Sequence, residues 1–341
     1  MKALILAGGQ GTRLRPLTTF TPKPIVPLVN RPFAHYQIEL LRRAGVTDIT
    51  FSLNYQPEKI EQTLGNGSEF GVNIRYVCEP SPMGTGGAFA YSMEGSEEPT
   101  VVMNGDILTD LRLGELIDFH QANKAAVSMA LVRVPDPSRF GVADLDAEHR
   151  ILRFLEKPQG KVTPNTINAG IYIIEPSVLE SIPSREKLSF EYDIFPKLLE
   201  QQSRFYGYVM EDTYWRDIGT LESYLEAHLD YLAGRLVRFK SESTGDATAT
   251  HSGVDASSVI GENCTIKPGA EIVNSVLGPG VCIERQASVR NSVIWSRTRV
   301  ASSADIQHSI IGRGCHIGRN AFVRHGSALG DNALLPDYTV V

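Results

Sequence analysis

The feature that most limits the possible folds of this 341-residue chain is a repeat of aliphatic residues near its C-terminal end. The repeat advances mostly in steps of six residues, with a step of five after Ile272, Val289 and Ile306, so that three steps span 17 or 18 residues. This spacing predicts a parallel β-helix over residues 251–341, a three-faced prism of about five coils with the aliphatic side chains stacked inward. The repeated positions are Val254, Ile260, Ile266, Ile272, Leu277, Ile283, Val289, Ile294, Val300, Ile306, Ile311, Ile317, Val323, Leu329 and Leu335.

Residues 1–232 have a different pattern, in which strand-like and helix-like segments alternate. This alternation predicts an α/β domain with a mostly parallel sheet. Residues 233–250 change character and include a polar, aperiodic stretch from Lys240 to Gly245, which predicts a linker. The strand-like runs are Ala3–Leu6, Asp48–Leu53, Ile74–Cys78, Thr100–Met103, Ala126–Val132, Ile151–Leu155 and Gly170–Ile174.

A glycine-rich loop, Gly8–Gly11, follows the first strand-like run, and Arg13, Arg15 and Lys23 come shortly after it. Glycine lets a backbone approach phosphate closely, and successive N–H groups can form an anion cradle. The loop is not a P-loop, which needs Gly-Lys-Ser/Thr, and it lacks the third small residue of a dinucleotide fingerprint. The pattern therefore favours a phosphate site of another type over a strand-to-helix turn without a ligand.

The stretch from Gly8 to Thr18, followed by Pro22–Pro24, resembles the signature of the sugar-1-phosphate nucleotidyltransferases. That signature reads Gly-Gly-x-Gly-Thr-Arg-Leu-x-Pro-Leu-Thr and then Pro-Lys-Pro, and every element is present here. The resemblance implies a Rossmann-like nucleotidyltransferase domain that uses Mg²⁺ to join a nucleoside triphosphate to a sugar 1-phosphate. The combination with a β-helix, left-handed in the related proteins, implies GTP and mannose 1-phosphate as the first candidates. The catalytic residues implied are Arg13, Lys23 and Lys157, and the loop residues implied to bind nucleotide are Ala7, Gly8, Gly9, Gly11 and Thr12.

A second glycine-containing loop, Glu79–Gly87, follows another strand-like run, and the resemblance implies that Gly84 and Thr85 hold the nucleobase. Thymidylyl- and uridylyltransferases of this type tend to carry an amide at the position of Glu79. A carboxylate only accepts hydrogen bonds, which suits the N1–H and N2–H₂ donors of guanine, so Glu79 favours GTP. The alternatives are a solvated loop acid at this position, or a thymidylyl- or uridylyltransferase acting on glucose 1-phosphate.

Two aspartates are candidate ligands of Mg²⁺. Asp106 ends the apolar run Val101–Met103 through Asn-Gly-Asp, and a carboxylate at a strand end beside polyphosphate suits a hard cation. The resemblance implies that Asp217, in Trp-Arg-Asp, is its partner. The alternatives are a turn aspartate at Asp106 and an N-terminal helix acid at Asp217.

The residues implied to surround the sugar come from three later motifs: Phe140-Gly141, Glu156-Lys157-Pro158 and Asn168-Ala169-Gly170. Gly141, Glu156, Asn168 and Gly170 would contact the sugar, and Lys157 would neutralise its phosphate. Taken alone, Glu-Lys-Pro is more typical of an exposed strand end.

Composition excludes several classes of protein. A net charge of -6 and a pI of about 5.8 argue against a nucleic-acid or membrane-surface binder. Four cysteines without metal-site spacing predict reduced, mostly buried thiols and a cytoplasmic protein, and the first apolar run is too short for a signal peptide. The regular β-helix predicts a homo-oligomer. Two further hypotheses remain: a non-catalytic regulatory subunit that binds nucleotide sugar, and an acyltransferase using a histidine such as His251 or His308 of the β-helix.

Overall fold

The computed structural model describes residues 1–158, 164–183, 185–239 and 253–341, and its chain forms two compact units. The sheet unit comprises residues 1–10 and 37–215, and the solenoid unit comprises residues 11–36 and 216–341. The predicted linker core, 240–250, and His251 lie outside the described residues.

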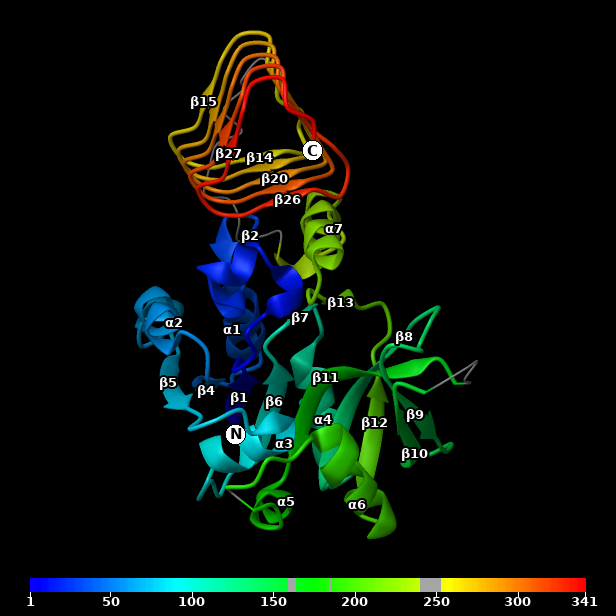
Figure 1. Ribbon diagram of the computed structural model, residues 1–341. Coiled ribbons are helices and arrows are strands. Elements are labelled where there is room, and N and C mark those ends of the chain that lie inside the picture. Colours follow the sequence, from blue (N-terminus) through cyan, green and yellow to red (C-terminus); the bar gives the residue numbers. More distant parts are fainter. Residues whose placement is uncertain (159–163, 184, 240–252) are drawn as a thin grey trace. The chain divides into compact units, whose positions relative to one another are not determined.

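A nine-stranded sheet forms the centre of the sheet unit (Figure 1). Its strands run in the order β10-β9-β11-β6-β1-β4-β5, and β8 pairs with both β11 and β12. The strands are β1 (Lys2–Leu6), β4 (Asp48–Leu53), β5 (Asn73–Cys78), β6 (Thr100–Asn104), β8 (Val127–Arg133), β9 (Gly141–Leu145), β10 (Ile151–Glu156), β11 (Thr166–Ile174) and β12 (Phe205–Val209).

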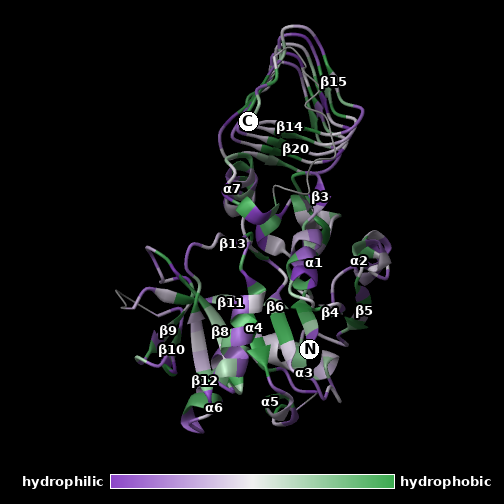
Figure 2. Ribbon diagram, turned by 180° about the vertical axis from the view of Figure 1, so that it is seen from behind, coloured by the Kyte–Doolittle hydropathy of each residue, from purple (hydrophilic) through white to green (hydrophobic). Residues whose placement is uncertain are grey.

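The predicted α/β architecture is confirmed, and the strand-like runs named above all form strands. The parallel part of the sheet is β6-β1-β4-β5, with a second parallel pair between β8 and β12. Antiparallel pairs occur where β11 joins β6, β8 and β9 and where β9 joins β10. Strands β1, β6 and β4 are almost fully buried, as continuous apolar runs of parallel strands usually are, and Figure 2 colours much of this region hydrophobic.

The helices of this part of the chain follow the strands of the sheet. They are α1 (Ala34–Arg43), α2 (Pro57–Leu64), α3 (Gly84–Ser92), α4 (Leu113–Ala122), α5 (Pro176–Glu180) and α6 (Phe195–Glu200), with a π-helical turn, η5, at Phe190–Ile194. Pro32, two residues before α1, lies in the short strand β3 (Arg31–Pro32), which pairs with β2 (Pro27–Leu28). Buried aromatic rings fill the core between the sheet and α6, and each fully buried ring stabilises the unit by about 1.5–3 kcal/mol.

The C-terminal residues of the solenoid unit form the predicted β-helix. Within residues 253–341 its short strands build three parallel sheets, one for each face of the prism, and five coils. Successive coils are related by 17 residues, as in Val259, Val276, Val293 and Ile310, and then by 18 residues at Ala328. Most of the repeated aliphatic side chains are buried in one continuous core, so the predicted inward stacking is confirmed.

Within each face of the prism, strands from successive coils pair side by side. The first face consists of β14 (Val259–Ile260), β17 (Val276–Leu277), β20 (Val293–Ile294), β23 (Ile310–Ile311) and β26 (Ala328–Leu329). The second consists of β15 (Thr265–Ile266), β18 (Cys282–Ile283), β21 (Arg299–Val300), β24 (His316–Ile317) and β27 (Leu334–Leu335). The third consists of β16 (Glu271–Val273), β19 (Ser288–Arg290), β22 (Asp305–Gln307) and β25 (Phe322–Val323).

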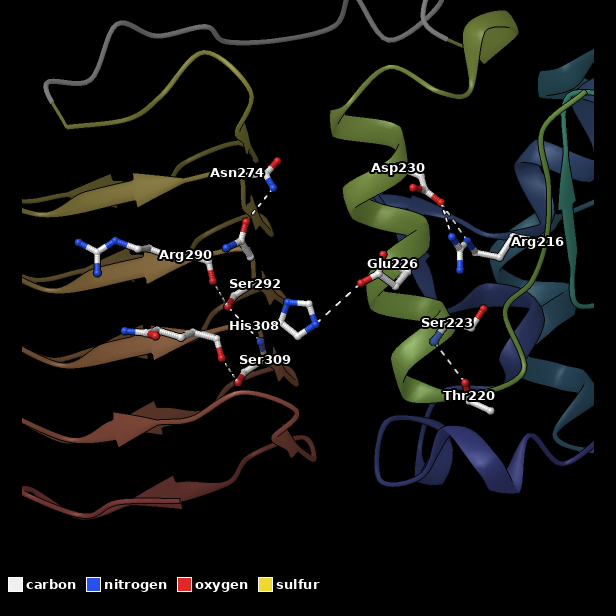
Figure 3. Close-up of polar contacts among 12 residues, drawn as sticks. Arg216, Thr220, Ser223, Glu226, Asp230, Asn274, Arg290, Ser292, His308 and Ser309 are labelled. Carbon is white, nitrogen blue, oxygen red and sulfur yellow. Dashed lines mark hydrogen bonds and ion pairs between the residues drawn. The ribbon is translucent and has the colours of Figure 1, made fainter. Parts of the chain in front are cut away.

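Helix α7 (Leu221–Leu232) belongs to the solenoid unit and lies against the β-helix (Figure 3). Thr220 caps its N-terminus by accepting a hydrogen bond from the Ser223 N–H, as the sequence predicts. Trp295 of the β-helix donates a hydrogen bond of 3.2 Å from Nε1 to the hydroxyl of Tyr224, and this hydroxyl in turn donates to the carbonyl oxygen of Pro27. These contacts join α7, the β-helix and the segment before α1.

The cysteines are reduced in the structure, but they are less buried than expected. Cys315 is buried, Cys264 and Cys282 are half-buried, and Cys78 is exposed at the end of β5. The expectation of mostly buried thiols is therefore wrong. No helix among the described residues has the length and apolar character that a membrane span requires.

Candidate active site

The first half of the glycine loop lies in the sheet unit, directly after β1. The Ala7 N–H donates to the carbonyl oxygen of Ser52 at 2.9 Å, which fixes the start of the loop. A Cβ atom at Gly8 would lie 2.7 Å from Glu79 Oε1, so a larger residue at this position would displace that carboxylate. Gly9 is exposed, and a Cβ there would meet no protein atom within 4 Å, so the loop backbone is open to a ligand at this residue.

The second half of the loop, from Gly11 onward, lies in the solenoid unit. Gly11 has a φ of +63°, in the region that favours glycine, and its carbonyl oxygen accepts a hydrogen bond of 2.7 Å from the hydroxyl of Thr18. A Cβ at Gly11 would press on Thr18 and on Lys23, which begins the 3₁₀ turn η3 (Lys23–Ile25). Thr12 and Arg13 follow in the exposed 3₁₀ turn η1 (Thr12–Leu14).

Asp217 and Arg13 converge within the solenoid unit. A Cβ at Gly219 would lie 2.7 Å from both the Arg13 Nη2 atom and the Asp217 Oδ1 atom. Asp217 ends the short strand β13 (Trp215–Asp217), and its backbone carbonyl accepts a hydrogen bond from the Ser223 hydroxyl at the start of α7. The sequence therefore brings a cation and a carboxylate of the predicted site together across a glycine.

Glu79 is fixed in place in the sheet unit. Its Oε1 atom accepts a hydrogen bond of 3.0 Å from the Ser52 hydroxyl, and its Oε2 atom accepts one of 3.0 Å from the Met83 N–H. The backbone N–H of Glu79 donates to Leu53 at 2.7 Å. The alternative of a solvated loop acid is therefore wrong, because this half-buried carboxylate is bound by two donors and packed against Gly8.

Gly84 and Thr85, at the start of α3, contact the segment before η5. Gly84 has a φ of +73°, and a Cβ there would lie 2.4 Å from the carbonyl oxygen of Leu188. Thr85 accepts a hydrogen bond of 2.9 Å from the Phe190 N–H and donates one of 3.0 Å to Glu191 Oε2. These contacts explain both residue types structurally, and a role in holding the base stays a prediction.

Asp106 lies at the carboxyl end of β6, beside the end of β1. The preceding Gly105 donates its N–H to the carbonyl oxygen of Leu6 at 2.9 Å, and a Cβ at Gly105 would lie 2.6 Å from the same oxygen. The half-buried Asp106 carboxylate thus follows a turn that only glycine allows. The nearby Asp110 has a structural role, because its Oδ1 atom accepts a hydrogen bond of 2.8 Å from the Tyr214 N–H.

Glu156 and Gly141 face each other across β10 and β9. They are register partners, and a Cβ at Gly141 would lie 2.7 Å from Glu156 Oε2 and 2.4 Å from the ring of Phe154. Burial raises the pKa of Glu156. The ammonium group of Lys157 lies 3.1 Å from Glu156 Oε1, and this hydrogen bond raises the pKa of Lys157. Lys157 itself is largely exposed, so its charge is accessible to a substrate.

Asn168 and Gly170 form a bulge in β11. The Asn168 side chain donates to the Tyr172 hydroxyl at 2.7 Å, and its Oδ1 atom accepts from the Gly170 N–H at 2.8 Å. Gly170 has a φ of +71°, and a Cβ there would lie 2.7 Å from the Asn104 side chain. The bulge therefore places Gly170 next to Asn104 at the end of β6.

Glu191 and Tyr172 interact with these candidate sugar-binding residues, although they are not among the residues predicted from the motifs. Burial, followed by the charges of Glu191, Glu156 and Asp106, holds the pKa of Tyr172 well above its ordinary value. The charges of three carboxylates thus act on one buried tyrosine hydroxyl in the sheet unit. No local sequence signal distinguishes Glu191 from a solvated acid.

Comparison with known proteins identifies the family of the chain. The family model "Nucleotidyl transferase" matches residues 2–234, and the model of the left-handed β-helix (LbH) domain of the EIF2B epsilon subunit matches residues 240–341. The chain therefore belongs to the nucleotidyl transferase family and is an enzyme of the sugar-1-phosphate nucleotidyltransferase class that carries a left-handed β-helix.

Several curated relatives are similar over most of the chain. A mannose-1-phosphate guanylyltransferase of Mycobacterium tuberculosis is 36% identical over 80% of this chain and 79% of its own length. A mannose-1-phosphate guanyltransferase of Candida albicans is 43% identical over 68% of this chain and 65% of its own length. Among solved structures, a Bacillus anthracis protein assigned as a glucose-1-phosphate thymidylyltransferase, crystallised with sucrose, matches with a TM-score of 0.61 and 28% identity, covering 67% of this chain and 94% of that protein.

Proposed function

We propose that this protein transfers a guanylyl group from GTP to mannose 1-phosphate and releases pyrophosphate. The observation that carries the proposal is the carboxylate of Glu79, held by two donors in the loop between β5 and α3, because a carboxylate accepts the N1–H and N2–H₂ donors of guanine. The names of the M. tuberculosis and C. albicans relatives support the same choice of base and sugar.

In the proposed reaction, an oxygen of the sugar phosphate attacks the α-phosphorus of GTP in line, and pyrophosphate leaves. The attacking oxygen is already anionic, so no strong general base is needed, and catalysis consists of positioning and charge neutralisation. The backbone of Gly8–Gly11 and the Arg13 guanidinium bind the β- and γ-phosphates. Lys23 stabilises the charge that develops at the α-phosphate.

The sugar phosphate is held by residues of the sheet unit. Lys157 binds its phosphate and places the attacking oxygen, and the pairing with Glu156 keeps the ammonium group protonated at neutral pH. The Glu156 carboxylate accepts hydrogen bonds from sugar hydroxyls. The Asn168 amide can both accept hydrogen bonds from these hydroxyls and donate hydrogen bonds to them. Gly141 leaves room for the Glu156 side chain, and Gly170 leaves room for the Asn104 side chain, because a Cβ atom at either glycine would collide with that neighbour.

Mg²⁺ fits the donor set of this proposal. Mg²⁺ prefers oxygen ligands, and it is usually bound by one or two carboxylates together with substrate phosphates and water. Asp106 and Asp217 would supply these carboxylates. The charges of Asp106, Glu156 and Glu191 all act on Tyr172, so a cation offsets an excess of negative charge there. When bound, Mg²⁺ supplies further neutralisation of the phosphate charge.

Assembly through the β-helix belongs to the proposal as well. The last coils expose Phe322, Leu334, Tyr338 and Val340, and Leu334 and Tyr338 are more than 70% exposed. Such apolar residues are favourable at an interface between two copies of the same chain.

The test is pyrophosphate release with Mg²⁺, each of GTP, dTTP, UTP, CTP and ATP, and either mannose or glucose 1-phosphate. The proposal predicts the highest kcat/KM for GTP with mannose 1-phosphate. The second candidate is a thymidylyl- or uridylyltransferase acting on glucose 1-phosphate, which the likeness to the B. anthracis structure favours. A preference for dTTP or UTP with glucose 1-phosphate would establish that candidate, and no release with any pair would favour a regulatory subunit.

A further inference from the structure

The Glu79 carboxylate is connected to two buried serines that no motif identifies. Ser52 lies in β4 and is fully buried, and Ser92 ends α3 and is 4% exposed. The Ser92 hydroxyl donates to the Ser52 hydroxyl at 2.9 Å, and the Ser52 hydroxyl donates to Glu79 Oε1 at 3.0 Å. The three side chains form one hydrogen-bonded series that runs from the sheet interior to the base loop.

The direction in which these hydroxyl groups donate their hydrogen bonds follows from the chemistry of the Glu79 carboxylate. An ionised carboxylate has no proton to donate, so Ser52 must direct its only proton toward Glu79. The oxygen of Ser52 is then left as an acceptor, and Ser92 supplies the donor. Hydrogen bonds in such a series strengthen one another at low dielectric, and bonds to a charged acceptor are stronger than neutral ones.

The series also fixes how the carboxylate is turned. Oε1 is held by Ser52 and packs against Gly8, and Oε2 is held by the Met83 N–H at 3.0 Å. Each oxygen can accept a further hydrogen bond, because a carboxylate offers about four lone-pair sites. Loss of the Ser52 hydroxyl would leave only one of the two donors and would free the group to rotate.

We propose that Ser52 and Ser92 are positioning residues that set the base preference of the enzyme by orienting the carboxylate of Glu79. This inference rests on the proposed function, in which Glu79 accepts hydrogen bonds from guanine. Both serines are buried among protein atoms, so they act through Glu79 and not by contact with the nucleotide.

The experiment compares GTP with ITP, which lacks the 2-amino group of guanine, at saturating sugar 1-phosphate and Mg²⁺. Ser52→Ala should raise KM for GTP about 10-fold or more, as expected for losing a hydrogen bond to a charged group, with kcat changed little. The ratio of kcat/KM for GTP over ITP should fall with it. Ser92→Ala should shift the ratio in the same direction by less, and it provides the test if Ser52→Ala does not fold.

Ser128→Ala is the matched control. Ser128 is fully buried in β8 and hydrogen-bonded to His120 at 2.9 Å, so its substitution removes a comparable buried hydroxyl elsewhere in the same sheet. It should leave the GTP to ITP ratio unchanged. An equal fall in Ser128→Ala, or an unchanged ratio in both Ser52→Ala and Ser92→Ala, would overturn the inference.

Glu79→Gln separates the inference from the proposed function. If the serines act through Glu79, Ser52→Ala should add no further loss of the ratio in the Glu79→Gln background, and full additivity would overturn the inference. A collapsed ratio in Glu79→Gln with a normal ratio in both serine variants would overturn the positioning role alone. An unchanged ratio in Glu79→Gln would overturn both the base assignment and the inference.

Discussion

Lys23 and Asp106 carry the two fixed charges on which the proposed reaction depends most. Lys23 begins η3, held close to Gly11, and Asp106 follows the constrained turn at Gly105. We predict that Lys23→Ala or Asp106→Ala lowers kcat at least about 100-fold, the scale for losing one preorganised charge contact. The exposed Lys197→Ala and Asp118→Ala are the charge-matched controls. Near-normal turnover of Lys23→Ala or Asp106→Ala would remove that residue from the catalytic set.

The sequence motifs identify candidate residues for the chemistry, but they do not show how those residues are held in the structure. Gly8, Gly11, Gly84 and Gly170 stand where a Cβ would collide or where φ is positive, so a local motif could reveal them. Ser52, Ser92 and Glu191 could not be found in this way. Each is an ordinary residue in its own segment, and its role arises from contacts with residues far away in the chain.

At the scale of elements, α7 contains a buried histidine with a distinct effect on stability. His228 is 1% exposed, its ring packs on Tyr224 at 4.7 Å, and burial lowers its pKa to about 3. The folded state therefore keeps it neutral, while the unfolded chain binds a proton below about pH 6.5. Its contribution to stability is thus fully present above pH 6.5 and is lost as the pH falls toward 3.

We predict that His228→Phe reduces this loss, because phenylalanine keeps the ring contact and cannot be protonated. The difference in unfolding free energy between the variant and the native protein should change by about 2 kcal/mol in favour of the variant between pH 7 and pH 5. Urea unfolding at the two pH values measures it. A pH-independent difference would show that folding does not lower the pKa of His228.

The contact between α7 and the β-helix depends on the Tyr224 hydroxyl, which accepts from Trp295 and donates to Pro27. Tyr224→Phe leaves a buried donor and a buried acceptor without this partner, so it should cost about 1–3 kcal/mol of unfolding free energy. Phe190→Leu, which changes a buried ring in the sheet unit, is the comparison variant. Amide hydrogen exchange is measured in both variants. Tyr224→Phe should raise exchange in α7, whereas Phe190→Leu should raise it near η5. Unchanged exchange in α7 of Tyr224→Phe would contradict this assignment.

Secondary-structure elements were predicted well where the sequence pattern is periodic. They were predicted less well where contacts with distant parts of the chain determine the structure. The coils of the β-helix and the strand β4 match their predicted positions, because a regular repeat and a continuous apolar run leave few alternatives. The antiparallel direction of β11 could not be read from its sequence, since a buried strand looks alike in either direction. The two-residue strand β3 could not be predicted either, because its pairing with β2 follows no periodic pattern.

At the scale of the whole molecule, the β-helix is proposed to bring copies of the chain together. Replacing both Leu334 and Tyr338, the most exposed apolar residues of the last coils, by aspartate should lower the mass measured by light scattering toward that of one chain, because a buried charge is costly. Replacing the polar Asn332 and Asp337, which are also exposed, by serine should leave the mass unchanged. A native protein that is already monomeric would contradict the proposed assembly.

The most direct test of the whole account is a competition in one vessel. The enzyme receives Mg²⁺, inorganic pyrophosphatase, equal amounts of GTP, dTTP, UTP, CTP and ATP, and equal amounts of mannose and glucose 1-phosphate, and the products are identified by mass spectrometry. The account predicts GDP-mannose as the main early product. A dominant dTDP- or UDP-glucose product would contradict the choice of base and sugar, and the absence of any nucleotide sugar would contradict the proposed activity itself.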